Sequence, residues 1–174
     1  MSQDPDAKGE EGSAMRTAMA VLEALKASSL LKGFTDTGLQ ILAGIASDRT
    51  FPRGAPIFVE NMVAESLFII GQGKVSISVK GNNGEEIPVG ELGPGDSLGE
   101  LALLQQGQRM CSAVALTLVS AVELRSSDFQ RLLGQKPQAC LKLLMAIVSQ
   151  FSARLADNRE ALRTLLPRGS LPRV

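Results

Sequence analysis

Histidine, tyrosine and tryptophan are all absent from this 174-residue sequence. Because histidine is the usual general base and a common zinc ligand, its absence argues against most hydrolytic and zinc-dependent chemistry. Only two cysteines occur, Cys111 and Cys140, and neither belongs to a C-x-x-C or Cys/His metal spacing. This pattern is typical of free thiols in a reducing compartment. We therefore expect a protein that is not an enzyme and that holds no metal or cofactor.

An excess of charge of either sign is missing as well, since 18 lysines and arginines balance 18 aspartates and glutamates. That balance gives no electrostatic reason to expect binding to nucleic acid or to an anionic membrane. The N-terminus is acidic and polar without an apolar signal core, and the apolar runs are shorter than a membrane span. The sequence thus predicts a cytoplasmic location, with no membrane and no DNA among its partners.

The length allows one domain with some additional helix, and the sequence pattern changes twice along the chain. Residues 1–14 are polar and acidic, which predicts a disordered tail. Residues 15–48 form a helical lead-in, where apolar residues recur at helical spacing and Thr35 is typical of a helix N-cap. We expect residues 15–166 to form the domain and residues 167–174 to form a second disordered tail.

Short apolar stretches separated by glycine-rich turns fill residues 49–125. Val75 and Ile77 alternate with polar residues, as in a half-buried strand, and residues 81–84 are typical of a hairpin turn. Asn61 occupies another turn, where asparagine tolerates left-handed backbone almost as well as glycine. Strands at this spacing predict a small roll or barrel. The expected fold class is α+β, an eight-stranded antiparallel β-roll with N-terminal helices and a C-terminal helix.

Helical spacing returns in residues 126–166. Ser126 suits a helix cap, and Pro137 suits the first turn of a long helix that should end near Leu166. In that helix the apolar steps alternate between three and four residues, as in a heptad seam. The seam consists of Leu141, Leu144, Val148, Phe151, Leu155, Asn158, Leu162 and Leu165. A polar Asn158 can fix the register of two helices, so we expect a parallel homodimer; packing of the seam on the roll is the alternative.

The stretch from residue 95 to residue 115 reads GDSLGELALLQQGQRMCSAVA. It joins a glycine-flanked helical turn to a carboxylate, Glu100, and to an arginine nine positions later, Arg109. Backbone N–H groups at such a turn favour an anion. An arginine can meet a phosphate with two parallel N–H bonds, whereas a lysine offers a point charge. The pattern predicts a phosphate site, unless the two residues are only surface ion-pair partners.

The Gly-Glu-Leu-Ala-Leu run with arginine at this spacing resembles the phosphate-binding cassette of the cyclic-nucleotide-binding domain family. The order of helices, roll, cassette and C-terminal helices is also similar to that family, and glycines fall where its members turn, at Gly54, Gly73, Gly95 and Gly99. The resemblance implies that Arg109 binds a cyclic phosphate and that Glu100 accepts a hydrogen bond from the ribose 2′-hydroxyl. The residues implied to bind phosphate and ribose are Gly99, Glu100, Leu101, Ala102 and Arg109.

The resemblance extends to the base, with one departure from the family pattern. Met110 follows the arginine, where the family often has a small residue and where threonine resembles the cGMP-preferring arrangement. Met110 therefore favours cAMP as the ligand, and Cys111 is small enough to line the pocket. By position, the base would lie against Ile77 and Val89, which are otherwise core residues.

The long C-terminal helix is implied to be the lid over the base. Counting without gaps from Arg109 places the base-capping position at Arg154, and Asn158 follows one turn later. Asparagine could pair with the edge of adenine, and arginine could stack on any base. The sequence leaves both residues open as the cap.

The resemblance implies a cytoplasmic cAMP sensor that signals to an unknown effector protein through its C-terminal helix. Only residues 167–174 follow that helix, which is too little for a helix-turn-helix. Two alternatives stay open: a degenerate fold that serves only interaction or dimerisation, and a sensor of another nucleotide, such as cGMP or a cyclic dinucleotide. The chain is either a stand-alone sensor or a fragment of a longer protein.

Overall fold

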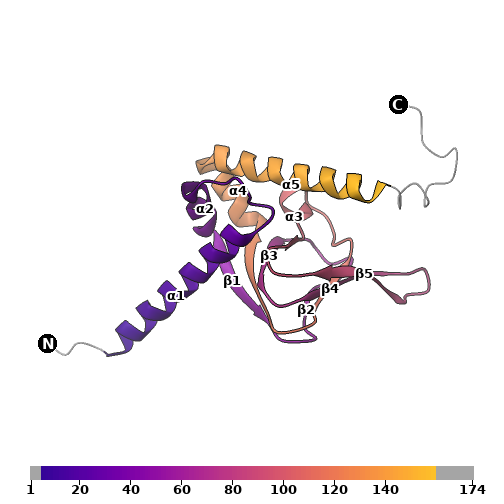
Figure 1. Ribbon diagram of the computed structural model, residues 1–174, viewed down its shortest axis with the longest axis horizontal. Coiled ribbons are helices and arrows are strands. Elements are labelled where there is room, and N and C mark those ends of the chain that lie inside the picture. Colours follow the sequence, from indigo (N-terminus) through magenta and orange to yellow (C-terminus); the bar gives the residue numbers. More distant parts are fainter. Residues whose placement is uncertain (1–4, 160–174) are drawn as a thin grey trace.

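Two four-stranded antiparallel sheets, flanked by helices, make up this computed structural model, which describes residues 5–159 (Figure 1). The strands are β1 (Ala46–Phe51), β2 (Pro56–Phe58), β3 (Ser66–Gln72), β4 (Val75–Lys80), β5 (Glu86–Leu92), β6 (Ser97–Leu98), β7 (Ser112–Ala115) and β8 (Val119–Arg125). The helices are α1 (Pro5–Ala27), α2 (Asp36–Ala43), α3 (Leu101–Leu104), α4 (Ser126–Gln135) and α5 (Pro137–Asp157). The predicted eight-stranded antiparallel roll in an α+β fold is confirmed.

The two sheets have the strand orders β1-β8-β3-β6 and β2-β7-β4-β5. Strand β3 separates two apolar cores, because successive side chains of a strand point to opposite faces. Leu67 and Ile69 pack with the helices, whereas Phe68 and Ile70 pack between the sheets. A strand that is buried on both faces reads as a continuous apolar run, which explains the sequence Leu-Phe-Ile-Ile.

Helix α1 begins at Pro5, so the prediction of a disordered tail over residues 1–14 is wrong from Pro5 onward. The acidity of this segment suggested disorder, but alanine, lysine and glutamate, which favour helix, make up five of residues 5–14, and a proline suits the first helical turn. Its N-terminal part projects away from the body, and its C-terminal part lies against the sheet (Figure 1). There Ala24 faces Gly71, whose added Cβ would lie 3.4 Å from the Ala24 Cβ atom, so small residues allow the close approach.

The roll begins earlier than expected, because β1 starts at Ala46 and not at residue 49. Its sequence is largely polar and its four central residues are exposed. It is an edge strand that pairs with β8, from Ala46 opposite Leu124 to Phe51 opposite Val119. Backbone pairing with β8 therefore defines this strand, and hydrophobic periodicity could not reveal it.

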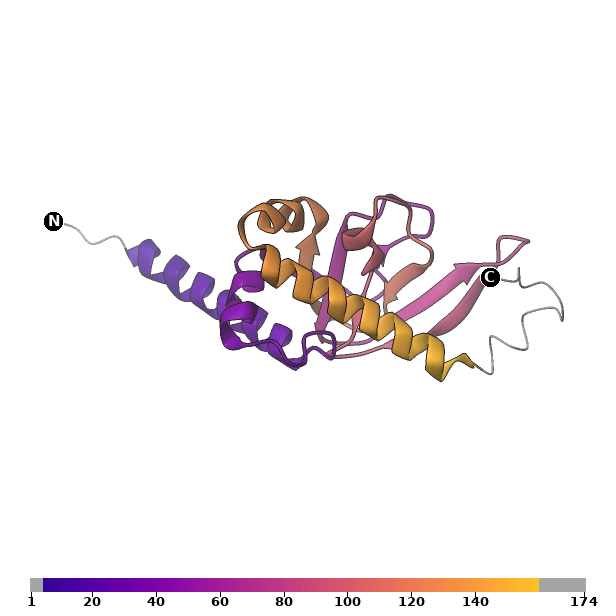
Figure 2. The same ribbon diagram turned by 90° about the horizontal axis from the view of Figure 1, so that it is seen from above.

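Helix α5 crosses the top of the roll from α4 toward the β4–β5 end (Figure 2). Its inner face is fully buried at Cys140, Leu143 and Ile147. The predicted heptad seam is split between two faces, since Leu144 and Phe151 pack against the core. The outer face carries an exposed apolar stripe, defined here as Leu141, Met145, Val148 and Leu155. The predicted seam positions Leu162 and Leu165, the helix end near Leu166 and residues 167–174 lie outside the described residues.

Within residues 5–159, α5 is also the helix that is long and apolar enough to cross a membrane by length and composition. That test gives weak support for a span, because a helix with one face in a protein core passes it too. Here the inner face of α5 lies in the core, and Lys142 Nζ donates to the Gly33 carbonyl over 2.7 Å. We attribute the apolar character of α5 to its packing faces.

Candidate functional site

The predicted cassette forms a tight turn between β6 and α3, and Gly99 is its pivot. Gly99 has φ +79°, in the left-handed region that a side chain disfavours. A Cβ atom added there would also collide with Arg109 Nη1 and lie 2.8 Å from the Ser66 carbonyl oxygen. Glycine is therefore required both by the backbone and by the close approach of the arginine.

Arg109 is buried, with 7% of its surface exposed. Its Nη1 donates to the Ser66 carbonyl over 2.9 Å, and its guanidinium carbon lies 4.1 Å from the centre of the Phe58 ring. Its Nε has no hydrogen-bond partner, and no ion pair among residues 5–159 includes it. A buried cation without a paired carboxylate favours an anionic ligand, because an uncompensated buried charge is costly.

Burial lowers the pKa of the Arg109 guanidinium, although the neighbouring Cys111, Glu123 and Glu65 offset part of that effect. The ordinary pKa of arginine is so far above neutrality that the side chain keeps its proton. The site therefore presents a fixed positive charge to its cavity.

Glu100 is the second buried charge of the site, with 5% of its surface exposed. Its Oε1 accepts a hydrogen bond from the Ser97 hydroxyl at 2.8 Å. The same oxygen lies 3.4 Å from Nη1 of Arg154, which reaches the site from α5. A carboxylate held in this way is an acceptor for a ligand hydroxyl. The contact with Arg154 also ties the C-terminal helix to the cassette.

Two adjoining cavities contain these groups, and they share Phe58, Gly99, Glu100 and Cys111. The smaller, of about 130 Å³, holds the arginine end and is lined from α5 by Phe151. The larger, of about 330 Å³, extends along β5 to Arg154. One end thus offers positive charge, the middle offers a carboxylate, and the far end offers apolar strand surface.

Ten of the eleven predicted site residues line these cavities. The arginine-end cavity is lined by Gly99, Glu100, Leu101, Ala102, Arg109, Met110 and Cys111, and the larger cavity by Ile77, Val89 and Arg154. Val89 is 63% exposed and is therefore not a core residue. Asn158 lies outside both cavities; as the C-cap of α5, it donates through Nδ2 to the Arg154 carbonyl over 2.8 Å.

The backbone donors of the cassette are only partly free. The Ala102 N–H donates to the Gly99 carbonyl over 3.1 Å, within the turn that opens α3. A phosphate at this point would have to compete with that weak turn contact. The prediction that Leu101 and Ala102 supply amide donors therefore involves a local adjustment of the turn at Ala102.

Sequence reasoning missed several residues that build the site. Phe58 supports the guanidinium of Arg109, Ser97 donates to Glu100, and Phe151 lines the smaller cavity. Ser97 could have been found, because it stands three residues before the carboxylate on a tight turn. Phe58 and Phe151 carry no local signal, since they come from distant segments and look like ordinary core residues.

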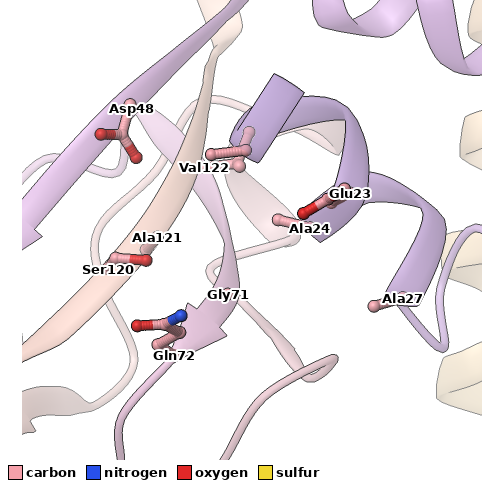
Figure 3. Close-up of a pocket in the computed structure, with 10 residues that line it drawn as sticks. Glu23, Ala24, Ala27, Asp48, Gly71, Gln72, Ser120, Ala121 and Val122 are labelled. Carbon is pink, nitrogen blue, oxygen red and sulfur yellow. The ribbon is translucent and has the colours of Figure 1, made fainter. Parts of the chain in front are cut away.

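Another hollow, of about 220 Å³, lies between α1 and strands β1, β3 and β8 (Figure 3). It shares no lining residue with the two site cavities. Glu23 and Asp48 supply its charges, and no lysine or arginine lines it. Its charge is therefore opposite to what a phosphate requires.

The chain belongs to the cyclic nucleotide-binding domain family, because residues 48–136 match the family model described as "Cyclic nucleotide-binding domain". That range includes every strand residue from β1 Asp48 onward, the cassette and α4. The match identifies a cyclic nucleotide-binding domain and does not specify the nucleotide.

Known relatives agree with this assignment. The cyclic AMP receptor protein of Thermus thermophilus is 30% identical over 113 residues, which are 65% of this chain and 52% of that protein. The crystal structure of the Thermus thermophilus catabolite activator protein aligns with 27% identity and a TM-score of 0.70, over 79% of this chain and 63% of that one. The chain spans only about half to three fifths of the length of the curated relatives that it matches.

A solved cyclic nucleotide-binding domain from Methylobacillus flagellatus has the same fold, with a TM-score of 0.75. It covers 90% of this chain and 88% of its own, at 20% identity. The overlap extends well beyond the 48–136 match, so the fold shared with that domain includes helical segments outside it.

Proposed function

We propose that this protein is a cyclic-nucleotide sensor and that its ligand is cAMP. The phosphate binds Arg109 and the cassette backbone, while Glu100 accepts the ribose 2′-hydroxyl. The base lies in the larger cavity against Ile77 and Val89, under Arg154. The observation that carries the proposal is the pair of buried charges, Arg109 and Glu100, in adjoining cavities. The relationship to a cyclic AMP receptor protein supports the choice of ligand.

Two features favour cAMP over cGMP and Arg154 over Asn158. Met110 is 73% exposed and offers no hydroxyl where a cGMP-preferring domain has threonine. Arg154 lines the base cavity, whereas the Asn158 side chain binds its own helix. Stacking of a guanidinium on a purine also suits a lid that must open and close.

We infer that the signal leaves through α5. Phe151 and Arg154 join this helix to the cavities, so a nucleotide that fills them changes the contacts of the helix. A ligand shifts such an equilibrium only by its differential affinity for the two positions of the helix. The exposed apolar stripe at Leu141, Met145, Val148 and Leu155 has alternating steps and suits a second copy of the helix. The proposed readout is helix position, read by a homodimer and an effector protein.

The proposal places the protein in the cytoplasm and gives it no catalytic role. Its proposed partner is another protein, and neither DNA nor a membrane is proposed as a partner. Light scattering tests the homodimer: a monomer at high concentration, with and without cAMP, would contradict it.

Calorimetric titration with cAMP and cGMP, on the wild type and on Arg109→Ala, tests the sensor function. We expect wild-type binding with preference for cAMP and loss of binding in the variant. Arg131→Ala is a matched control, because this exposed arginine pairs only with Asp128 on the same helix. Flat heats for the wild type with both nucleotides would leave a degenerate interaction module, or a different nucleotide such as a cyclic dinucleotide.

A further inference from the structure

A third buried charge, Glu123, lies in the middle of β8 and lines neither site cavity. It is 6% exposed. A buried carboxylate is costly unless it is paired, so its partners indicate what holds it in place. Its Oε1 accepts from the Ser66 hydroxyl over 2.6 Å. Two arginines flank it, with Arg49 Nε 3.4 Å from Oε2 and Arg125 Nε 3.6 Å from Oε1.

Ser66 connects this carboxylate to the phosphate site. Its hydroxyl binds Glu123, and its carbonyl accepts the 2.9 Å hydrogen bond from Arg109 Nη1. Both contacts are buried. Glu123 and Arg109 also line one cavity of about 340 Å³, beside the rings of Phe58 and Phe68. Ser66 therefore contacts Glu123 through its side chain and Arg109 through its backbone.

We propose that Glu123 is the positioning residue for Arg109, acting through Ser66; this inference rests on the proposed nucleotide-binding function. Glu123 fixes the Ser66 hydroxyl, and Ser66 holds Nη1 of the arginine. With Phe58 beneath the guanidinium, its orientation is set before the ligand arrives. Such preorganisation saves the ordering cost that binding would otherwise carry.

The flanking arginines have a defined part in this arrangement. An unpaired Glu123 would compete with a phosphate for the Arg109 charge. Arg49 and Arg125 approach Glu123 from exposed positions and neutralise it. The carboxylate can then orient Arg109 through Ser66 without forming a direct ion pair with it.

A purely electrostatic role of Glu123 and a positioning role predict opposite changes in ligand affinity for Glu123→Gln. Removing a negative charge near the site should by simple electrostatics tighten the binding of an anion. Loss of positioning should weaken it, because an amide makes a weaker hydrogen bond than a carboxylate. The sign of the change therefore separates the two accounts.

The first experiment is calorimetry of the full chain with cAMP on wild type, Glu123→Gln and Asp48→Asn. Asp48 is an exposed acid on β1, so its variant removes one negative charge from the same sheet without a buried partner. We expect Glu123→Gln to weaken binding about tenfold and Asp48→Asn to leave it unchanged. Unchanged or tighter binding in Glu123→Gln overturns the inference.

A second measurement needs no nucleotide. The Arg109 Nε–H signal in ¹⁵N-arginine spectra, identified by its loss in Arg109→Lys, reports how firmly the guanidinium is held. We expect this signal to exchange faster with water in Glu123→Gln and in Ser66→Ala, which keeps the carbonyl but loses the hydroxyl. An Nε–H exchange rate that equals the wild-type rate in both variants overturns the inference.

The two measurements separate failure of the inference from failure of the proposed function. If the wild type binds no cyclic nucleotide, the function fails, while the Arg109 signal still shows whether Glu123 positions the arginine. If the wild type binds cAMP and the variants match it in affinity and spectrum, only the inference fails. Should Glu123→Gln not fold, Ser66→Ala carries both measurements.

Discussion

The two ends of the proposed nucleotide site, a phosphate end and a base end, are held in different ways. At the phosphate end, Glu100 and Arg109 are almost fully buried and fixed by contacts from β3, β6 and the aromatic core. At the base end, Val89 is 63% exposed, and the Arg154 side chain is 43% exposed and held by long contacts of 3.4 and 3.5 Å. The buried end is suited to binding charge in a set geometry, and the open end is suited to movement.

This difference implies that the two ends of the site have separate roles, one in affinity and the other in signalling. Preorganised charge supplies affinity, since it avoids reorganisation on binding. A loosely held lid can respond to the ligand, because a signal requires two positions of similar free energy. Substitutions at the phosphate end should therefore remove binding, whereas those at the base end should mainly alter its strength and its coupling to α5.

Among substitutions that keep both Glu100 and Arg109, Gly99→Ala should have the largest effect, since it acts on the phosphate end. The substitution strains a backbone at φ +79° and drives a methyl group into Arg109 Nη1. We expect about a hundredfold weaker cAMP binding by calorimetry, as one or two charge-assisted hydrogen bonds are lost. The matched control is Gly84→Ala, with φ +81° but open space around the added carbon.

The control should lose only about 1–2 kcal/mol of stability, the cost of left-handed backbone, and should bind normally. Thermal unfolding measures that cost in both variants. Equal cAMP affinity in the two would contradict the rigid phosphate end, because the collision with the arginine would then not matter.

Arg154→Ala should have a smaller effect, since it acts on the lid. Removing the guanidinium loses its contact with Glu100 and its stacking on the base, and we expect about tenfold weaker binding. Asn158→Ala is the matched control, because within residues 5–159 that side chain bonds to the Arg154 carbonyl and lines neither site cavity. Calorimetry measures both variants. A larger loss in the asparagine variant would show that Asn158 caps the base.

The grouping of Glu100 with Arg109 in one cavity could be predicted from the sequence, because the signal for it is local. Glu100 and Arg109 stand nine positions apart on one turn and loop, and glycines punctuate that stretch. Gly54, Gly73, Gly95 and Gly99, the four turn glycines expected from the sequence, all have positive φ, as does Asn61 at +68°. Glycine and asparagine are favoured where a turn requires positive φ, so these positions could be recognised from the sequence without the structure.

The supporting residues could not be predicted, because they reach the site across the fold. Ser66 lies 57 residues from Glu123 and 43 from Arg109. The pairing of β3 with β8 brings it to Glu123, and the bridge between Val63 and Gln108 brings it near Arg109. The start of β1 was missed for the same reason, since a polar edge strand has no apolar period. The predicted heptad seam of α5 is split between two faces, because helical spacing alone does not say which face of a helix packs against the core.

Alkylation of the two cysteines tests where the nucleotide lies, with an expected severalfold change in the reaction rate of one of them. Cys111 lines both site cavities, whereas Cys140 is fully buried on the inner face of α5. We expect iodoacetamide to modify Cys111 in the native protein and bound cAMP to slow this reaction severalfold, as measured by mass spectrometry. Cys140 should react only after denaturation. Equal reaction of Cys111 with and without cAMP would place the nucleotide elsewhere.

The pH dependence of that reaction has a defined sign. Burial raises the pKa of the Cys111 thiol, Arg109 opposes this in part, and Glu60 and Glu100 add to it. Because the thiolate is the reactive form, the alkylation rate of Cys111 should rise with pH and reach half its maximum at a higher pH than that of a free thiol. Arg109→Lys should leave this direction unchanged, since both side chains are cations.

The smallest effect is expected from Val89→Ala, at the open end of the site. The substitution removes two methyl groups from a partly exposed wall, so about threefold weaker cAMP binding is expected by calorimetry. Leu118→Ala is the matched control, a 67% exposed apolar residue that lines neither cavity. If Val89→Ala instead weakened binding as much as Gly99→Ala, the base end would supply most of the affinity. Moving the lid would then cost much of the binding free energy, and the separation of affinity at the phosphate end from movement at the base end would be contradicted.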